Sequence, residues 1–268
     1  MVFRIISDYY HLLLRRPYKL QVVKDSGGNK PVILLLHGLA SDSDTWTRLY
    51  PLISDSHRVI SLDLLGFGKS PKPIRQKYDL SCHANNVINT LKSLKISQDI
   101  TIVGHSMGGL IAIQIAKQKP QLVSKIITVG MPLYNKDDIK SKSKFKITAT
   151  TNSLFRIYTY LINNKHSTLK RAKKVMAVNL KQNSFKLNEN NWVPFKKSMQ
   201  NSIMNQSSIT DIKHLKIPMV FLYGNMDLLI VSKHYKEFSN PNVTIIRYTG
   251  AHLVTLSVAK IIADFIKN

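Results

Sequence analysis

The sequence predicts an α/β fold with a mostly parallel central sheet, flanked by helices and interrupted by a helical insertion. Apolar, β-branched runs alternate with helix-forming segments through most of the 268 residues, a pattern typical of right-handed crossovers between parallel strands. Between residues 132 and 211 this alternation stops and helical stretches replace it. We therefore expect residues 1–131 and 212–268 to form the core, with residues 132–211 as a helical cap (lid) over one edge of the sheet.

Composition limits the class of protein. With 44% hydrophobic residues, the chain can bury a sizeable core. Its single cysteine, Cys82, excludes an intramolecular disulfide framework and is compatible with a reducing cytoplasm. No run approaches the roughly 18 apolar residues that span a bilayer. Residues 1–16 predict a short amphipathic helix rather than a secretory signal. We expect a cytoplasmic protein, with peripheral membrane contact left open.

The formal net charge of +24 predicts attraction to anionic surfaces. The lysines are spread along the chain, and no helix-turn-helix, zinc-finger or RNA-binding signature accompanies them. We therefore do not expect a nucleic-acid partner. Binding to an anionic membrane surface or to an anionic substrate remains an alternative. The simplest interpretation of the charge is a basic surface in contact with water.

The strands of the first half follow in order. Residues 20–24 predict an edge strand, residues 31–36 a strand buried on both faces, and residues 57–62 a further strand. The loop at 63–70 carries two glycines, but their spacing matches no phosphate-binding motif. Asp63 is therefore expected to accept hydrogen bonds from loop amides.

The sequence G-H-S-M-G at residues 104–108 follows an apolar strand and precedes good helix formers. In this context the G-x-S-x-G pattern predicts a nucleophilic serine at a sharp turn. Gly104 and Gly108 allow strand and helix to approach each other. The turn would expose the Ser106 hydroxyl and place the Met107 N–H at a helix N-terminus, where it can stabilise an oxyanion.

A second oxyanion donor is expected just after the buried strand at 31–36. Gly38 lets the backbone fold over the sheet edge there, which would bring the N–H of Leu39 to the site. His37 is expected to support this loop.

The βα pattern resumes after the insertion. A strand at 217–223 leads to Asp227, and a strand at 243–248 leads to His252. Because the carboxyl ends of parallel strands meet at one edge of the sheet, both side chains are expected near Ser106. A serine hydroxyl needs an imidazole to take its proton, and the imidazole needs a carboxylate to fix its tautomer. Ser106, Asp227 and His252 supply this set.

From residue 20 onward the chain resembles the α/β-hydrolase superfamily, in its capped serine esterase-like branch. The resemblance rests on five motifs in order: H-G at 37–38, D-x-x-G-x-G-x-S at 63–70, G-H-S-M-G-G at 104–109, G-x-x-D at 224–227 and G-x-H at 250–252. It implies a catalytic triad of Ser106, Asp227 and His252. It also implies an oxyanion hole from the backbone of Leu39 and Met107, with no metal or organic cofactor.

The activity that this resemblance implies is hydrolysis of a small-molecule acyl ester through an acyl-enzyme. Serine at the turn disfavours the chemistry of the family's epoxide hydrolases and haloalkane dehalogenases, which requires an aspartate. The alternatives are hydrolysis of a thioester, a lactone or a C–C bond, or a ligand receptor or interaction module with little turnover. Apolar cap residues are candidates to line the acyl pocket: Phe145, Phe155, Tyr158, Leu161, Met176, Trp192, Phe195 and Met204.

Other histidines, and another position for the acid, are alternatives to the expected triad. His105 is expected to point away from the serine, and His214 and His234 to lie on the surface or in the cap. Some relatives place the acid after the strand before the cap, but residues 130–132 read Gly-Met-Pro and offer no carboxylate. Asp227 is therefore the expected acid.

Overall fold

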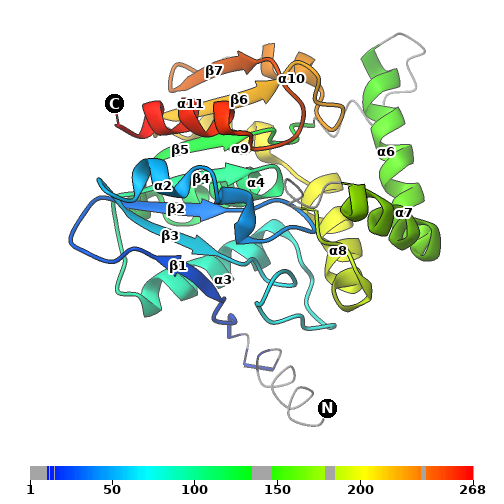
Figure 1. The fold of residues 1–268 in the computed structure, drawn as a ribbon, viewed down its shortest axis with the longest axis horizontal. Helices are drawn as coiled ribbons and strands as arrows, with labels where there is room; N and C mark the ends of the chain where they lie inside the picture. The colour runs from blue at the N-terminus through cyan, green and yellow to red at the C-terminus, as the bar shows by residue number, and fades with distance from the viewer. Residues whose placement is uncertain are drawn as a thin grey trace.

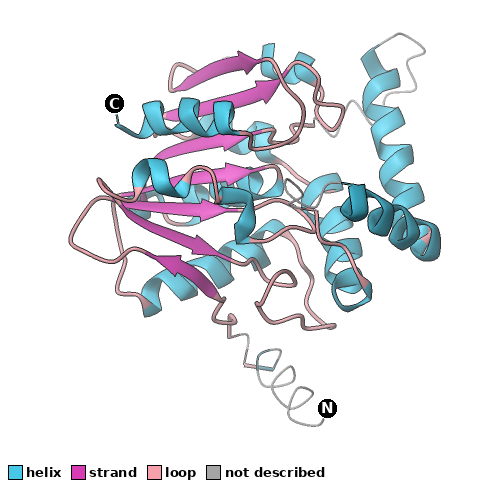
Figure 2. Ribbon diagram, viewed as in Figure 1, coloured by secondary structure: helices cyan, strands magenta, loops and turns pink. Residues whose placement is uncertain are grey.

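The computed structural model describes residues 11, 13–14, 16–134, 147–178, 185–236 and 240–267. A seven-stranded sheet runs through the centre in the order β1-β3-β2-β4-β5-β6-β7, with helices on both faces (Figures 1 and 2). Its strands are β1 (Val22–Asp25), β2 (Val32–Leu36), β3 (Arg58–Leu62), β4 (Ile100–His105), β5 (Val123–Val129), β6 (Met219–Gly224) and β7 (Val243–Tyr248). Only the edge strand β1 pairs antiparallel. The expected mostly parallel α/β architecture is confirmed.

Two apolar cores lie on opposite faces of the sheet. In β2, Leu34 and Leu36 enter one core while Ile33 and Leu35 enter the other, because successive side chains of a strand point to opposite faces. This explains the continuous apolar run of that strand. The first core is covered by α3 (Leu80–Ser93), α4 (Met107–Gln118) and α9 (Ser208–His214), and the second by α2 (Tyr50–Ile53) and α11 (Leu256–Lys267).

Several of the helices between β5 and β6 lie beyond the carboxyl ends of the parallel strands, on the side to which the arrows of these strands point (Figure 1). They include α6 (Ile147–Asn163), α7 (Lys165–Val178) and α8 (Trp192–Ser198). The sequence predicts helices around residues 153–163 and 169–180, and α6 and α7 begin earlier than this. The boundaries of a cap at 132–211 stay a prediction, since residues 135–146 and 179–184 lie outside the described chain. Most of the helix expected at 1–16 lies outside it as well.

Some element ends differ from the sequence expectation for local reasons. β6 starts at Met219 rather than at residue 217, because Pro218 has no N–H to give to a strand ladder. The sequence predicts a final helix over residues 254–267, but α11 starts at Leu256, and the Thr255 hydroxyl caps it by accepting the Val258 N–H at 3.4 Å. α10 covers Ser232–Lys236. Within the described residues, no helix combines the length and apolarity needed to cross a bilayer.

Candidate active site

Ser106 is the single residue between the end of β4 and the start of α4. Its φ of 53° and ψ of −120° fall where residues with a side chain are rarely found, so the turn holds backbone strain. A Cβ on Gly104 would lie 2.5 Å from the Gly109 nitrogen, and a Cβ on Gly108 would lie 2.1 Å from the Leu36 oxygen. Both glycines are therefore required for the close approach of β4, α4 and β2 that places the serine at the sheet edge.

Asp227 and His252 follow β6 and β7 and contact each other directly. His252 Nδ1 donates a hydrogen bond of 2.6 Å to Asp227 Oδ2. The Asp227 side chain is fully buried, whereas that of His252 is 20% exposed. The Leu229 N–H donates to Asp227 Oδ1 at 2.9 Å, so both carboxylate oxygens are held. With its proton on Nδ1, the neutral imidazole has Nε2 available as a base.

Ser106 and His252 line the same pocket, of about 410 Å³. In the described chain, the hydrogen bonds of the His252 side chain and carbonyl go to Asp227 and His105, and none joins it to Ser106. In structures without substrate, a catalytic hydrogen bond of this kind is often long and shortens once substrate is bound. The structure thus brings all three expected side chains to one edge of the sheet.

The expected oxyanion donors come from the loop after β2 and from the start of α4. Leu39 lines the pocket together with Ser106. A Cβ on Gly38 would lie 3.0 Å from His105 Nδ1 and 3.2 Å from the Ser106 Cβ, so this loop packs directly on the turn. The N–H of Met107 belongs to the first turn of α4, where no acceptor exists within the helix. The segment that carries Leu39 and the start of α4 therefore both lie next to Ser106.

His37 holds the loop after β2 in place. Its Nε2 accepts the Leu64 N–H at 2.9 Å, and its Nδ1 donates to the Gly38 carbonyl at 2.8 Å. Both bonds require the neutral ring, and burial lowers the pKa of His37 accordingly. The side chain supports the loop as the sequence suggests.

Asp63 joins the loop after β2 to the loop after β3. Its Oδ1 accepts hydrogen bonds from the backbone N–H and hydroxyl of Ser43, at 3.0 and 2.8 Å, and its Oδ2 accepts the Lys69 N–H at 2.7 Å. The expectation that this carboxylate binds loop amides is confirmed.

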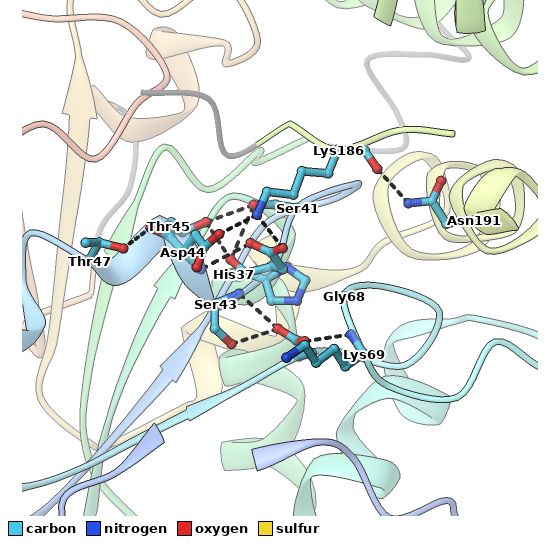
Figure 3. Close-up of polar contacts among 12 residues, drawn as sticks. His37, Ser41, Ser43, Asp44, Thr45, Thr47, Gly68, Lys69, Lys186 and Asn191 are labelled. Carbon is cyan, nitrogen blue, oxygen red and sulfur yellow. Dashed lines mark hydrogen bonds and ion pairs between the residues drawn. The ribbon is translucent and has the colours of Figure 1, made fainter. Parts of the chain in front are cut away.

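Lys186, which the sequence analysis did not single out, attaches the segment after α7 to the loop after β2 (Figure 3). Its Nζ lies 2.6 Å from Asp42 Oδ2 and 2.5 Å from Asp44 Oδ2, and its backbone N–H donates to the Ala40 carbonyl at 2.5 Å. Burial alone would lower the pKa of Lys186, but the hydrogen bonds to the two carboxylates outweigh it and raise the pKa. Ala40 directly follows the expected donor Leu39.

The walls of the pocket are almost entirely apolar. Of the cap residues that the sequence suggests, Tyr158, Leu161 and Phe195 line it. Three others pack into the core instead: Phe155, Trp192 and Met204. Phe145 and the side chain of Met176 lie outside the described residues. Several further lining residues could not be predicted, because their segments carry no motif: Arg171, Phe185, Met199, Ile203 and Leu229.

Two expectations about histidines are wrong. His105 does not point away from the site, because its Nε2 lies 3.0 Å from the His252 carbonyl oxygen and the two rings are 4.8 Å apart between centroids. Burial, with the neighbouring His252, lowers the pKa of His105 to about 3, so its ring is neutral near pH 7. His234 is buried rather than on the surface. His214 is exposed, as expected.

Gly130 lies directly after β5, in the segment where some relatives carry the acid of the triad. It follows β5 with a φ of 58°, and a Cβ there would lie 3.0 Å from both Asp227 Oδ2 and His252 Nδ1. The backbone at Gly130 therefore borders the Asp227–His252 pair directly. Asp227 reaches this position from the neighbouring strand.

Comparison with known proteins agrees with this geometry. The model of the alpha/beta hydrolase fold family matches residues 31–254, which is most of the chain. The chain belongs to this family.

Individual relatives match over shorter stretches. An uncharacterized protein of Mycobacterium tuberculosis is 38% identical over 135 residues, covering 50% of this chain and 36% of that protein. Human epoxide hydrolase 4 is 36% identical over 121 residues, covering 41% and 33%. The chain thus spans about a third of the length of these relatives. A hydrolase from Oleispira antarctica matches in fold, with a TM-score of 0.71 over 94% of this chain and 98% of that one, at 17% identity.

Proposed function

We propose that this protein is a serine hydrolase that cleaves a carboxylic ester through an acyl-enzyme. In this proposal Ser106 is the nucleophile, His252 the general base and Asp227 the acid that orients it. The backbone N–H groups of Leu39 and Met107 form the oxyanion hole. The observation that carries the proposal is the Asp227–His252 hydrogen bond of 2.6 Å beside a strained serine on the wall of the same apolar pocket.

In the proposed reaction, His252 first accepts the proton of Ser106 and then donates it to the leaving alcohol. His252 Nε2 takes the proton of the Ser106 hydroxyl as its oxygen attacks the ester carbonyl, and Asp227 stabilises the imidazolium that forms. The N–H groups of Leu39 and Met107 stabilise the oxyanion. The C–O bond to the alcohol then breaks, and His252 gives its proton to the departing oxygen. Water, activated by the same base, cleaves the acyl-enzyme and restores the serine.

Serine at the turn between β4 and α4 supports acyl transfer over epoxide opening. Similarity to human epoxide hydrolase 4 covers 41% of this chain, yet the chemistry of the family's epoxide hydrolases requires an aspartate nucleophile. Here residue 106 is serine, which carries no carboxylate to open an epoxide and form an ester with it. Hydrolysis of a thioester, a lactone or a C–C bond could use the same three side chains.

The apolar pocket supports an acyl group as the part of the substrate that it holds. Its walls combine Leu39 with side chains of the segment between β5 and β6, such as Leu161 and Phe195. We propose that residues 132–211 act as a cap that shields this pocket from water, which strengthens the electrostatic interactions at the site. A volume of about 410 Å³ lies within the ordinary range of small-molecule sites.

The test is turnover of p-nitrophenyl esters of varied acyl length by the full chain. We expect hydrolysis by the wild type, and a loss on the order of 10³ or more in Ser106→Ala. Wild type that reacts with a fluorophosphonate but hardly turns over any ester would favour a receptor with this fold. Turnover of thioesters, lactones or C–C substrates well above that of esters would favour those alternatives.

A cytoplasmic location is part of the proposal. Cys82, the single cysteine, is half-buried, and burial raises the pKa of its thiol to about 11. A chain with one cysteine forms no internal disulfide, which is compatible with a reducing compartment. Fractionation of the native host cells tests the location.

A further inference from the structure

Exposed apolar side chains flank the triad's acid at the edge of the pocket. In the loop after β6, Met226 is 58% exposed and Leu228 is 85% exposed, on either side of Asp227. On α6, Ile157 and Tyr160 are exposed and one helical turn apart. Large apolar side chains in water cost free energy, and when they gather at one place they mark a surface that meets something apolar.

Contacts join this loop to α6, and α6 to α7. The Leu229 carbonyl lies 3.3 Å from the Tyr134 hydroxyl and 3.4 Å from that of Tyr158 on α6. The Arg171 guanidinium of α7 lies over the Tyr160 ring of α6, 5.4 Å from its centroid. Leu229 and Arg171 both line the active-site pocket. The loop, α6 and α7 thus border one opening, and we call their exposed side chains the pocket rim: Ile157, Tyr160, Lys170, Lys173, Lys174, Met226 and Leu228.

The charge of the rim has one sign. Residues 147–178 contain no aspartate or glutamate, and their six basic residues are Arg156, Lys165, Lys170, Arg171, Lys173 and Lys174. On α7, Leu169 and Ala172 are buried, whereas Lys170, Lys173 and Lys174 are exposed. Lys165 is the member with a described ion pair, 2.7 Å from Glu189. The three exposed lysines therefore add positive charge to α7, the helix whose Arg171 contacts the exposed Tyr160 of α6.

We propose that the pocket rim docks on an anionic lipid surface. Lysines beside exposed leucine, methionine and aromatic side chains are the combination that binds the boundary between lipid headgroups and acyl chains. A second part of the proposal rests on the proposed function: docking places the pocket mouth against the lipid, so that acyl chains enter the pocket without crossing water.

A lipid surface fits this rim better than a nucleic acid does. Nucleic-acid affinity comes chiefly from basic groups that neutralise phosphates, and it gains little from Met226 or Leu228 in an exposed loop. A membrane can bind both the lysines and the exposed apolar side chains, since it offers anionic headgroups and an apolar interior. Loss of binding upon removing the apolar side chains alone therefore separates the two partners.

The test measures co-sedimentation of the full chain with vesicles of phosphatidylglycerol and phosphatidylcholine, and with vesicles of phosphatidylcholine alone. We expect binding to the anionic vesicles that weakens as salt rises. The triple variant Lys170→Gln/Lys173→Gln/Lys174→Gln should lose about fivefold per lysine, on the order of 100-fold in all. Met226→Ser/Leu228→Ser should lose roughly tenfold or more.

Matched controls lie elsewhere on the molecule. Lys30→Gln/Lys92→Gln/Lys95→Gln removes the same charge near the amino ends of β2 and β4, and Val23→Ser removes an exposed apolar side chain from β1. Both should bind vesicles within about twofold of wild type. The proposal is overturned if the control triple loses as much as the α7 triple, or if the apolar double variant binds as wild type does. A duplex DNA that binds more tightly than the vesicles and depends only on the lysines would also overturn it.

Ser106→Ala keeps the two proposals apart. It should bind anionic vesicles as well as wild type does, whether or not the protein hydrolyses esters. The α7 triple should hydrolyse a short water-soluble ester at the wild-type rate, because these lysines lie outside the triad and the oxyanion hole. It should lose activity only toward esters embedded in anionic vesicles. Equal loss on both substrates would contradict the delivery of acyl chains from the lipid.

Discussion

His105 Nε2 donates a hydrogen bond of 3.0 Å to the backbone carbonyl of His252. The residue directly before the strained serine thus holds the loop that carries the expected base. Because burial lowers the pKa of His105 to about 3, the ring does not change its charge near neutral pH. This bond fixes the distance between β4 and the His252 loop, and so the distance across which the proton would pass.

The first prediction concerns His105 as a positioning residue. His105→Ala removes the bond to the His252 carbonyl and should lower kcat for short esters about 10- to 100-fold, because small misplacement of a catalytic group is costly. His105→Gln can still donate toward that carbonyl and should recover part of the loss. Steady-state kinetics and the rate of fluorophosphonate labelling are the measurements. If His105→Ala lowers the unfolding midpoint but leaves kcat unchanged, the role is only structural.

The second prediction uses Gly130, whose added Cβ would lie 3.0 Å from both Asp227 Oδ2 and His252 Nδ1. Gly130→Ala should lower kcat at least tenfold by separating this pair. It should also cost about 1–2 kcal/mol of unfolding free energy for its positive φ. Gly27→Ala is the matched control, because its φ of 66° is similar and no atom lies within 4 Å of an added Cβ. The control should lose stability and keep its kcat, and a kcat equal in both variants would refute the argument.

The third prediction concerns Lys186. Lys186→Met removes the ion pairs with Asp42 and Asp44, which hold the loop that follows Leu39. We expect faster hydrogen exchange at residues 40–46 and a kcat lowered roughly three- to tenfold, with little change in KM. Lys186→Arg keeps the charge and should restore most of both. The reverse pattern, in which KM rises while exchange at 40–46 is unchanged, would place Lys186 in substrate binding instead.

The fourth prediction is a pH dependence of stability. His83 is fully buried beside the Ser198 hydroxyl, at 3.1 Å, and burial lowers the pKa of His83 to about 3. The unfolded chain takes up this proton near pH 6.5, so the unfolding free energy should fall as pH drops from 6.5 toward 3, by up to about 1.4 kcal/mol per pH unit for each such histidine. Urea unfolding of His83→Gln should give a shallower fall over this range. An unchanged slope would contradict the assignment.

Much of the fold follows from local sequence signals. Strand β2 is buried on both faces, and its continuous apolar run predicts this directly. The turn at Ser106 could also be predicted, because Gly104 and Gly108 leave room for backbone atoms of neighbouring segments that a side chain would displace. Placing Asp227 and His252 near the serine required only that parallel strands end at one edge.

What the sequence did not reveal depends on contacts between distant segments. Lys186 is one of many lysines in the chain, and only the folded structure brings it 2.6 Å from Asp42, 144 positions away. The orientation of His105 likewise depends on the His252 loop, which no local pattern describes. The pocket walls combine residues from several segments without a motif, so the structure was needed to tell Phe195, which lines the pocket, from Phe155, which packs into the core.

The central claim is that Ser106 becomes acylated, and mass spectrometry of the intact chain tests it most directly. After brief incubation with a p-nitrophenyl ester and acid quenching, wild type should gain the mass of one acyl group, located at Ser106 by peptide mapping. His252→Ala should accumulate far less of it, and Ser106→Ala none. Ester turnover without any adduct at Ser106, or an adduct on another residue, would contradict the account.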